Sequence, residues 1–176
     1  MTNRPTLQSI AVPAGLILAA ALSRLIPHPP NFSPIEASAL FAGAYLLDRR
    51  AAVLVPILAM LLSDLVLGFH ALVPVTYGCM ALMALAGRWL ANDVTVGRVA
   101  ALGFASATFF FVVSNFFVWL TQGMYPMSFA GLELCYVEAL PFFQNEVAGV
   151  ATYATVLFGG YALLRLALPE SRASSA

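Results

Sequence analysis

The chain has 176 residues and a net charge of zero, with 61% hydrophobic and only 9% charged residues, and its mean hydropathy is +0.90. A soluble domain of this size carries about 25% charged residues, so the composition excludes an ordinary water-soluble protein and indicates an integral membrane protein. The neutral charge balance gives no support to a nucleic-acid partner, and the length suits a single domain over residues 1–176.

Six apolar segments predict an all-α integral membrane protein with six transmembrane helices. A membrane-spanning helix needs about 20 apolar residues, and the second segment is short for a full span. The first segment is expected to stay as a span, because no small-residue cleavage site follows it. In chain order, the predicted spans are Ile10–Ile26, Pro34–Leu47, Ala51–Phe69, Val75–Leu90, Val99–Leu120 and Glu146–Leu168.

All eight basic residues are arginines, and they alternate with the predicted spans. Seven of them fall at the termini or in every second connection, namely Arg4, Arg49, Arg50, Arg88, Arg98, Arg165 and Arg172. Positive charge marks the cytoplasmic side, so we expect both termini in the cytoplasm of a bacterial inner membrane. Most other polar residues then fall on the outer side, which predicts a polar cavity that opens outward.

The connection of residues 121–145 is predicted to be a long outer loop between the last two spans. It carries five aromatic residues, interrupted by Glu133 and Glu138. Long loops in compact proteins often serve as lids or binding loops. An amphipathic segment lying in the membrane interface is the alternative.

Charged and imidazole side chains near the outer end are candidates for ligand contacts. Asp64 lies close to the outer end of the third span, where an unpaired carboxylate is costly, and Arg24 is the nearest cation by depth. The sequence therefore predicts either a structural Arg24–Asp64 pair or a ligand contact by Asp64. His28 lies in IPHPPNFSP, whose prolines stiffen the chain, and a solvated interfacial histidine is the alternative to a binding residue there.

Cys79 follows Tyr77 and Gly78, about one turn into the fourth span. A buried cysteine is often a small apolar packing residue, whereas a thiolate is a good ligand for a soft or borderline metal. No His-x-x-His or Cys-x-x-Cys pairing accompanies Cys79, so a metal cage made by the protein alone is not expected. One thiolate can still complete the coordination of a metal that arrives inside a cofactor. A disulfide or redox pair of Cys79 with Cys135 is the rival account.

Motifs for nucleotide hydrolysis and for common hydrolase chemistry are absent from the sequence. It contains no nucleotide-binding loop, no zinc-protease HExxH and no Gly-x-Ser-x-Gly nucleophile motif. A transport function would therefore draw on a partner, on a gradient or on trapping of the ligand inside the cell.

Several stretches together resemble a family of small bacterial membrane proteins. RLIPHPPNFSPIEASALFAGAYL, SDLVLGFH and MYPMSFAGLELCYVEALPFFQNE, with VTYGCMALM in addition, resemble the BtuM type, which is implicated in cobalamin uptake. That type is similar in fold to the substrate-binding S components of energy-coupling-factor (ECF) vitamin transporters. The resemblance runs from about Arg24 to Gly160 and implies an S-component-like bundle with an outward-facing cavity.

The resemblance also implies a ligand and a chemical role for one cysteine. The ligand would be cobalamin, whose cobalt already has four equatorial nitrogens, so that Cys79 would need to supply only one axial bond. A thiolate on cobalt could displace cyanide, which would make Cys79 a catalytic residue for decyanation. The partners implied are cobalamin, the lipid bilayer, and either an ECF-type energising module or none. The candidate binding residues are Arg24, His28, Asp64, Tyr77, Cys79 and Tyr125.

Other functions stay open at this point. The same fold could bind another small vitamin or metabolite, with Cys79 as a packing residue. A membrane thiol redox protein would use Cys79 and Cys135 together, and a structural subunit of a larger complex would need neither.

Overall fold

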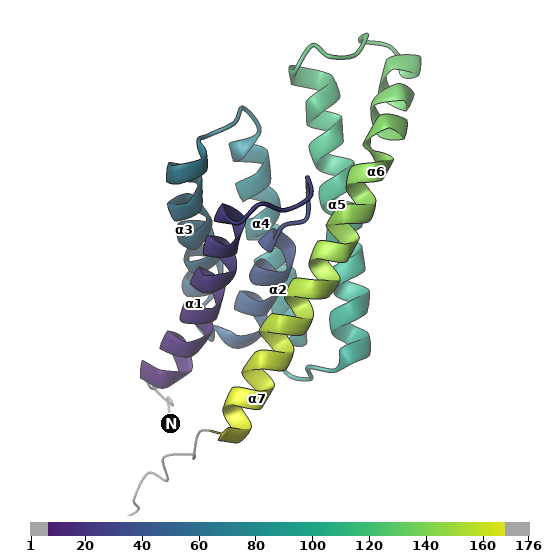
Figure 1. Cartoon of the computed structure of the whole chain (residues 1–176). Helices are drawn as coiled ribbons and strands as arrows, with labels where there is room; N and C mark the ends of the chain where they lie inside the picture. The colour runs from purple at the N-terminus through teal and green to yellow at the C-terminus, as the bar shows by residue number, and fades with distance from the viewer. Residues whose placement is uncertain (1–6, 168–176) are drawn as a thin grey trace, which may run out of the picture.

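A computed structural model describes residues 7–167, in which all regular structure is helical. The helices are α1 (Leu7–Leu22), α2 (Ile35–Tyr45), α3 (Arg49–Leu67), α4 (Val73–Gly87), α5 (Val96–Thr121), α6 (Phe129–Ala154) and α7 (Gly160–Ala167). Tight turns of 3-10 helix extend two of them, η1 (Ser23–Leu25) after α1 and η2 (Arg88–Leu90) after α4. A π-helical turn, η3 (Thr155–Gly159), joins α6 to α7, so the two form one long rod (Figure 1).

Four of these helical segments are long and apolar enough to cross a membrane. They are α3, α4 with η2, α5, and the rod of residues 129–167. The apolar part of α1, Ile10–Leu25, is shorter, and the 11 residues of α2 rise only about 16 Å at 1.5 Å per residue. The prediction of an all-α membrane protein is thus confirmed, and six complete spans stay a prediction.

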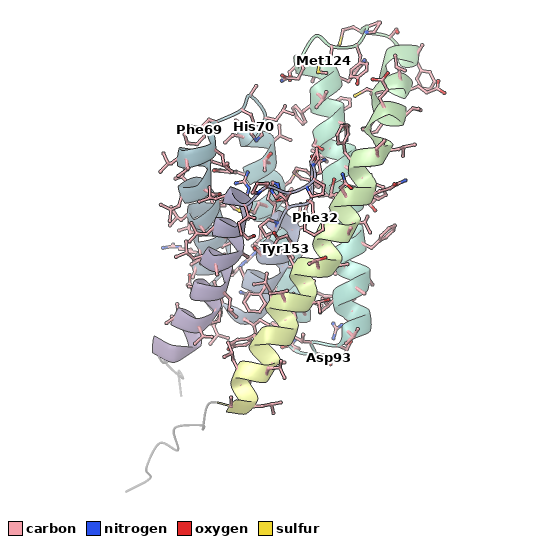
Figure 2. The ribbon with its side chains drawn as sticks, viewed as in Figure 1. Phe32, Phe69, His70, Asp93, Met124 and Tyr153 are labelled. Atoms are coloured by element: carbon pink, nitrogen blue, oxygen red, sulfur yellow. The ribbon has the colours of Figure 1, made fainter. Side chains whose placement is uncertain are left out.

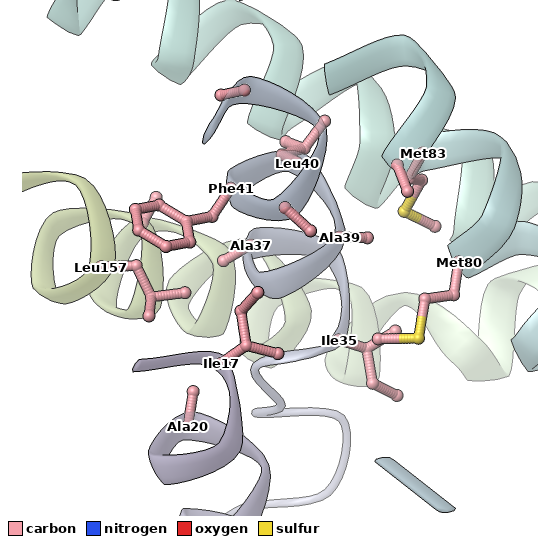
Figure 3. Packing of buried hydrophobic residues seen from close by; sticks show 14 of the residues in the cluster. Ile17, Ala20, Ile35, Ala37, Ala39, Leu40, Phe41, Met80, Met83 and Leu157 are labelled. Carbon is pink, nitrogen blue, oxygen red and sulfur yellow. The ribbon is translucent and has the colours of Figure 1, made fainter. Parts of the chain in front are cut away.

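The short helix α2 forms the centre of the bundle. All ten residues from Ile35 to Ala44 are buried, and α2 contacts α1, α3, α4, α5 and α6. Figure 3 shows Phe41 facing Leu157 on one side of α2, and Met80 and Met83 of α4 approaching the other side. Because α2 is covered by other helices, its length is not set by the thickness of the bilayer.

Close helix packing occurs where α2 meets α4. A Cβ atom on Gly43 would overlap the carbonyl oxygen of Ala84, and one on Gly87 would overlap the backbone of Leu40. Small residues allow such backbone approach. By contrast, a Cβ atom on Gly15 of α1 would meet nothing within 4 Å, so Gly15 is not a point of close helix packing inside the bundle.

The connections alternate between the two ends of the bundle, as predicted. The connections that follow α2 and α4, and the end of α7, lie at one end, where Asp93 is labelled (Figures 1 and 2). We call this the arginine end, because Arg49, Arg50, Arg88 and Arg98 lie beside these connections. The far end carries the connections of residues 26–34, 68–72 and 122–128, with His70 and Met124 labelled (Figure 2). Arg4 and Arg172 lie outside the described residues.

The long loop predicted for residues 121–145 is wrong. Helix α6 begins at Phe129, where the side chain of Ser128 accepts a hydrogen bond from the backbone N–H of Gly131 at 3.2 Å. Pro141 lies inside the helix, as transmembrane helices tolerate when neighbouring groups satisfy the freed carbonyl. Only residues 122–128 form the connection, and α5 and α6 project as a hairpin beyond α3 and α4 (Figure 1).

Candidate functional site

A cavity of about 500 Å³ lies at the far end of the bundle. Its wall is formed by η1, the start of α2, the far-end connections and the adjoining turns of α4, α5 and α6. Small-molecule sites usually enclose about 300–1,000 Å³, so the volume suits a small ligand. The wall carries an unusual number of polar groups for such an apolar chain, among them Arg24, His28, Glu36, His70, Asn115 and Glu138.

Three of the six predicted binding residues line this cavity. Arg24, His28 and Tyr125 belong to its wall. Asp64 and Tyr77 lie behind Arg24 and reach the site through it. Cys79 does not belong to the wall and is described below.

A hydrogen-bonded network fixes the guanidinium group of Arg24. Its Nη1 atom donates to Asp64 Oδ1 at 2.5 Å and to Ser63 Oγ at 2.7 Å. The hydroxyl of Tyr77 donates to the other carboxylate oxygen, Asp64 Oδ2, at 2.7 Å. The side chain of Asp64 is 3% exposed and that of Arg24 is 14% exposed. The predicted Arg24–Asp64 pair is confirmed, and it ties α3 to η1 and, through Tyr77, to α4.

Tyr125 contributes a second polar contact at the mouth of the cavity. Its hydroxyl donates to Glu138 Oε2 at 3.0 Å, which ties the α5–α6 connection to α6. The hydrogen bond to the carboxylate raises the pKa of Tyr125, because it stabilises the neutral phenol.

Cys79 and Cys135 are both free thiols in buried positions. Cys135 is on α6, not in a loop, and it lines the cavity, where its Sγ atom donates to the carbonyl of Asn115 at 3.5 Å. Cys79 is 3% exposed and packs in the core with Met80. It lies one helical turn below Thr76, which does line the cavity. Cys135, expected in the outer loop, is thus on a helix beside the cavity, and Cys79, expected to face the cavity, lies in the core.

The proline-rich connection of residues 26–34 is held against α6. Asn145 Nδ2 donates to the carbonyl of Pro30 at 3.0 Å, and the rings of Phe32 and Tyr153 lie 5.7 Å apart (Figure 2). Gly149 allows this contact, since a Cβ atom there would lie 2.9 Å from the backbone nitrogen of Ser33. The hydroxyl of Tyr153 also lies 2.8 Å from Ser23 Oγ.

Sequence reasoning missed Asn145, Gly149 and Tyr153 as the residues that position this connection. The prolines indicated that residues 26–34 are rigid, but no pattern in the sequence indicated what they pack against. The predicted site residue His28 therefore owes its place partly to α6.

Comparison with known proteins assigns a family. Residues 5–171 match a family described as a family of unknown function, DUF6580. The chain belongs to this family. No curated protein and no solved structure matches it. The DUF6580 assignment covers nearly the whole chain and names no ligand, so the chemistry of the cavity carries the functional argument.

Two buried glutamates complete the site of this DUF6580 protein. Glu36, on the first turn of α2, lines the cavity, and Glu146 of α6 lies next to it; each is 1% exposed. Glu36 Oε2 and both carboxyl oxygens of Glu146 have no hydrogen-bond partner. Sequence analysis assigned neither residue a role.

The described residues hold no cluster of three or more side chains suited to bind a metal ion. Cys79 lies behind Thr76, which belongs to the cavity wall.

Proposed function

We propose that this protein binds a small solute in the far-end cavity and takes part in its uptake across the bacterial inner membrane. The observation that carries this proposal is the cavity itself. It gathers charged, imidazole and amide side chains in a chain with only 9% charged residues. Polar groups inside a membrane protein are expensive and usually mark a substrate or ion pathway.

The proposed orientation has the far end facing outward and the arginine end facing the cytoplasm. It rests on the arginines beside the α2–α3 and α4–α5 connections and on the positive-inside rule. Single cysteines at Asn31 and Arg49, introduced into a chain with Cys79 and Cys135 replaced by Ala, test it in whole cells. A membrane-impermeant maleimide should label the Asn31→Cys variant alone, and labelling of both variants or of Arg49→Cys alone contradicts the orientation.

The proposed ligand is a corrinoid such as cobalamin. Its support is the sequence resemblance together with a buried thiol one turn below the cavity. A thiolate suits a borderline metal such as cobalt, and cobalt held in a corrin ring needs only one further donor. On cyanocobalamin, the Cys79 sulfur would form the bond to cobalt, cyanide would leave with the electron pair of the cobalt–carbon bond, and the thiol proton would pass to the departing cyanide.

This ligand requires the cavity to widen. A corrinoid with its nucleotide tail is larger than the drug-sized ligands that fill cavities of about 500 Å³. The connections of residues 26–34 and 122–128 would have to move apart, and the ligand would have to pass Thr76 to reach Cys79.

An absorbance spectrum tests the corrinoid proposal directly. Purified protein incubated with cyanocobalamin should retain a coloured ligand with shifted bands, because replacing cyanide by a thiolate changes the ligand field of cobalt. A Cys79→Ser variant should lose the shift and much of the affinity, and Cys135→Ser should keep both. If the Cys79→Ser variant gives the parent spectrum and affinity, cobalt is not ligated by Cys79.

A second candidate is a smaller vitamin or metabolite that fits the cavity as it stands. The position of Cys79 in the core, outside the wall of the cavity, favours this candidate. In that case Arg24→Gln and Glu138→Gln should weaken binding, while Cys79→Ala should not. A thermal-shift screen of small metabolites against the parent protein and these three variants separates the two candidates.

A further inference from the structure

The buried glutamates of α2 and α6 lie side by side inside the bundle. Glu36 and Glu146 are each 1% exposed, and three of their four carboxyl oxygens lack a hydrogen-bond partner. The fourth belongs to Glu36, which lines the far-end cavity. The pair therefore lies beneath the cavity, with one member in its wall and the other behind it.

No cation among the described residues neutralises this pair. The neighbouring arginine of the cavity, Arg24, is committed to Asp64 and Ser63. Buried carboxyl groups that face each other at short range do not both ionise, because desolvation and mutual repulsion oppose the second charge. A pair with no arginine beside it lowers its charge most simply by binding one proton, which leaves one negative charge on the pair.

Other titratable groups approach the pair from each surrounding element and are part of the same electrostatic environment. Cys79 of α4 is close enough to interact with both carboxyl groups. The groups that share the cavity are Arg24 from η1, His28 and His70 from the connections, Cys135 from α6, and Tyr125 and Glu138 at its mouth. Among these, Glu138 accepts a hydrogen bond from Tyr125 and not from Glu36 or Glu146.

We propose that Glu36 and Glu146 form a proton-binding site under the cavity, in which one proton is shared between the two carboxyl groups at neutral pH. The proton comes from cavity water, binds a carboxyl oxygen and leaves by the same route. The proposal uses the cavity of the proposed function but is independent of which solute the cavity takes.

The proton controls the contact between the connection of residues 26–34 and α6. Gly149, which packs against Phe32 and Ser33, follows Glu146 by three residues, and residues three apart share one face of a helix. Glu36 follows the same connection by two residues. Loss of the proton leaves two negative charges directly below this contact, and their repulsion and hydration separate α6 from the connection. The site thereby links the pH outside to the opening of the cavity.

Infrared titration of the full chain in lipid nanodiscs tests the shared proton. The C=O stretch of a protonated carboxyl group is distinct from that of a carboxylate. The parent protein should show this band at neutral pH and lose it at alkaline pH. Glu36→Gln and Glu146→Gln each remove the neighbouring negative charge, so the remaining carboxyl group should lose its proton at a lower pH. The double variant should lack the band. Glu133→Gln, at an exposed position on α6, is the matched control and should titrate like the parent.

Hydrogen–deuterium exchange of the peptide covering residues 26–34 tests whether the proton controls the contact of this connection with α6. In the parent, its protection should fall over the pH range in which the band disappears. The double Gln variant should stay protected after correction for the intrinsic pH dependence of exchange. A parent without the band at neutral pH, or a double variant that retains it, overturns the proton site. If the band titrates but the peptide is equally protected in the parent and the double variant, the proton does not control the contact between the connection and α6.

Discussion

The pairing of Arg24 with Asp64 gives a quantitative prediction, because both partners are poorly hydrated. The side chains are 14% and 3% exposed. Replacing Arg24 by Gln leaves the Asp64 carboxylate without its counter-ion, and replacing Asp64 by Asn leaves the guanidinium unpaired. Breaking one side of a buried pair costs about 3–5 kcal/mol. We expect about 3 kcal/mol for each single variant, at the lower end of that range, because Arg24 keeps some contact with water.

The assay measures the melting temperature of the purified protein in detergent. For a chain of this length, about 1 kcal/mol corresponds to about 2–4 °C, so each single variant should melt about 6–12 °C below the parent. The double variant Arg24→Gln with Asp64→Asn leaves no unpaired charge and should recover a large part of this loss. Tyr77→Phe removes one hydrogen bond to the same carboxylate and should cost about 1 kcal/mol.

A second ion pair in the same chain supplies the control. Arg98 Nη1 lies 2.9 Å from Asp93 Oδ2, but these side chains are 28% and 59% exposed. Exposed pairs contribute about 0–1 kcal/mol, so Asp93→Asn should melt close to the parent. If the double variant at Arg24 and Asp64 loses as much as the two single variants together, within about 0.5 kcal/mol, the two groups are not energetically coupled and the reasoning is refuted.

Two further predictions concern packing and titration. Gly43→Ala should destabilise the protein by about 1–3 kcal/mol in the same unfolding assay, because the new methyl group would overlap the Ala84 carbonyl. Gly159→Ala is the control and should be nearly neutral, because nothing lies within 4 Å of the new atom. Equal effects of the two substitutions would contradict the close α2–α4 contact. Glu138→Gln should lower the pKa of Tyr125, because in the parent the Glu138 carboxylate accepts a hydrogen bond from the Tyr125 hydroxyl and thereby raises its pKa. An ultraviolet difference titration, with Tyr125→Phe to identify the Tyr125 phenolate signal, measures the shift. An unchanged pKa of Tyr125 would contradict the hydrogen bond.

Sequence reasoning succeeded where a physical cost attaches to a single residue. An unpaired charge in the outer half of a membrane protein is expensive, so the depth of Arg24 and Asp64 along their helices was enough to predict their pairing. The alternation of connections was likewise predictable, because the arginines mark one end. These inferences needed only the order of residues along the chain.

The prediction of a long loop over residues 121–145 failed because a proline in that stretch usually interrupts a helix. Pro141 suggested a break in the chain, but it lies inside α6. A different signal was available in the same stretch, since Gly131, Cys135 and Ala139 recur every four residues and are all buried. That spacing is typical of one face of a helix, and it predicts α6 with Cys135 directed into the bundle.

The unexpected placement of the two cysteines has a related cause. Position along a helix gives depth, but it does not give the direction in which a side chain points around the axis. Cys79 has the depth expected of a cavity residue and packs in the core, whereas Thr76, one turn away, faces the cavity. The contact between Glu36 and Glu146 was beyond sequence reasoning for the same reason, because it joins helices that are far apart along the chain.

The charges around the cavity limit the kind of solute that it can take. Arg24 and Asp64 neutralise each other, and with one shared proton the Glu36–Glu146 pair keeps one negative charge. Glu138 adds a second negative charge at the mouth, where it accepts the hydrogen bond of Tyr125. An anionic solute would meet uncompensated negative charge in a site of low dielectric constant, where repulsion is strong. Apart from the two histidines, nothing in the wall offsets this charge, so the site favours a neutral or cationic solute, and dicarboxylates and phosphate monoesters are poor candidates for its ligand.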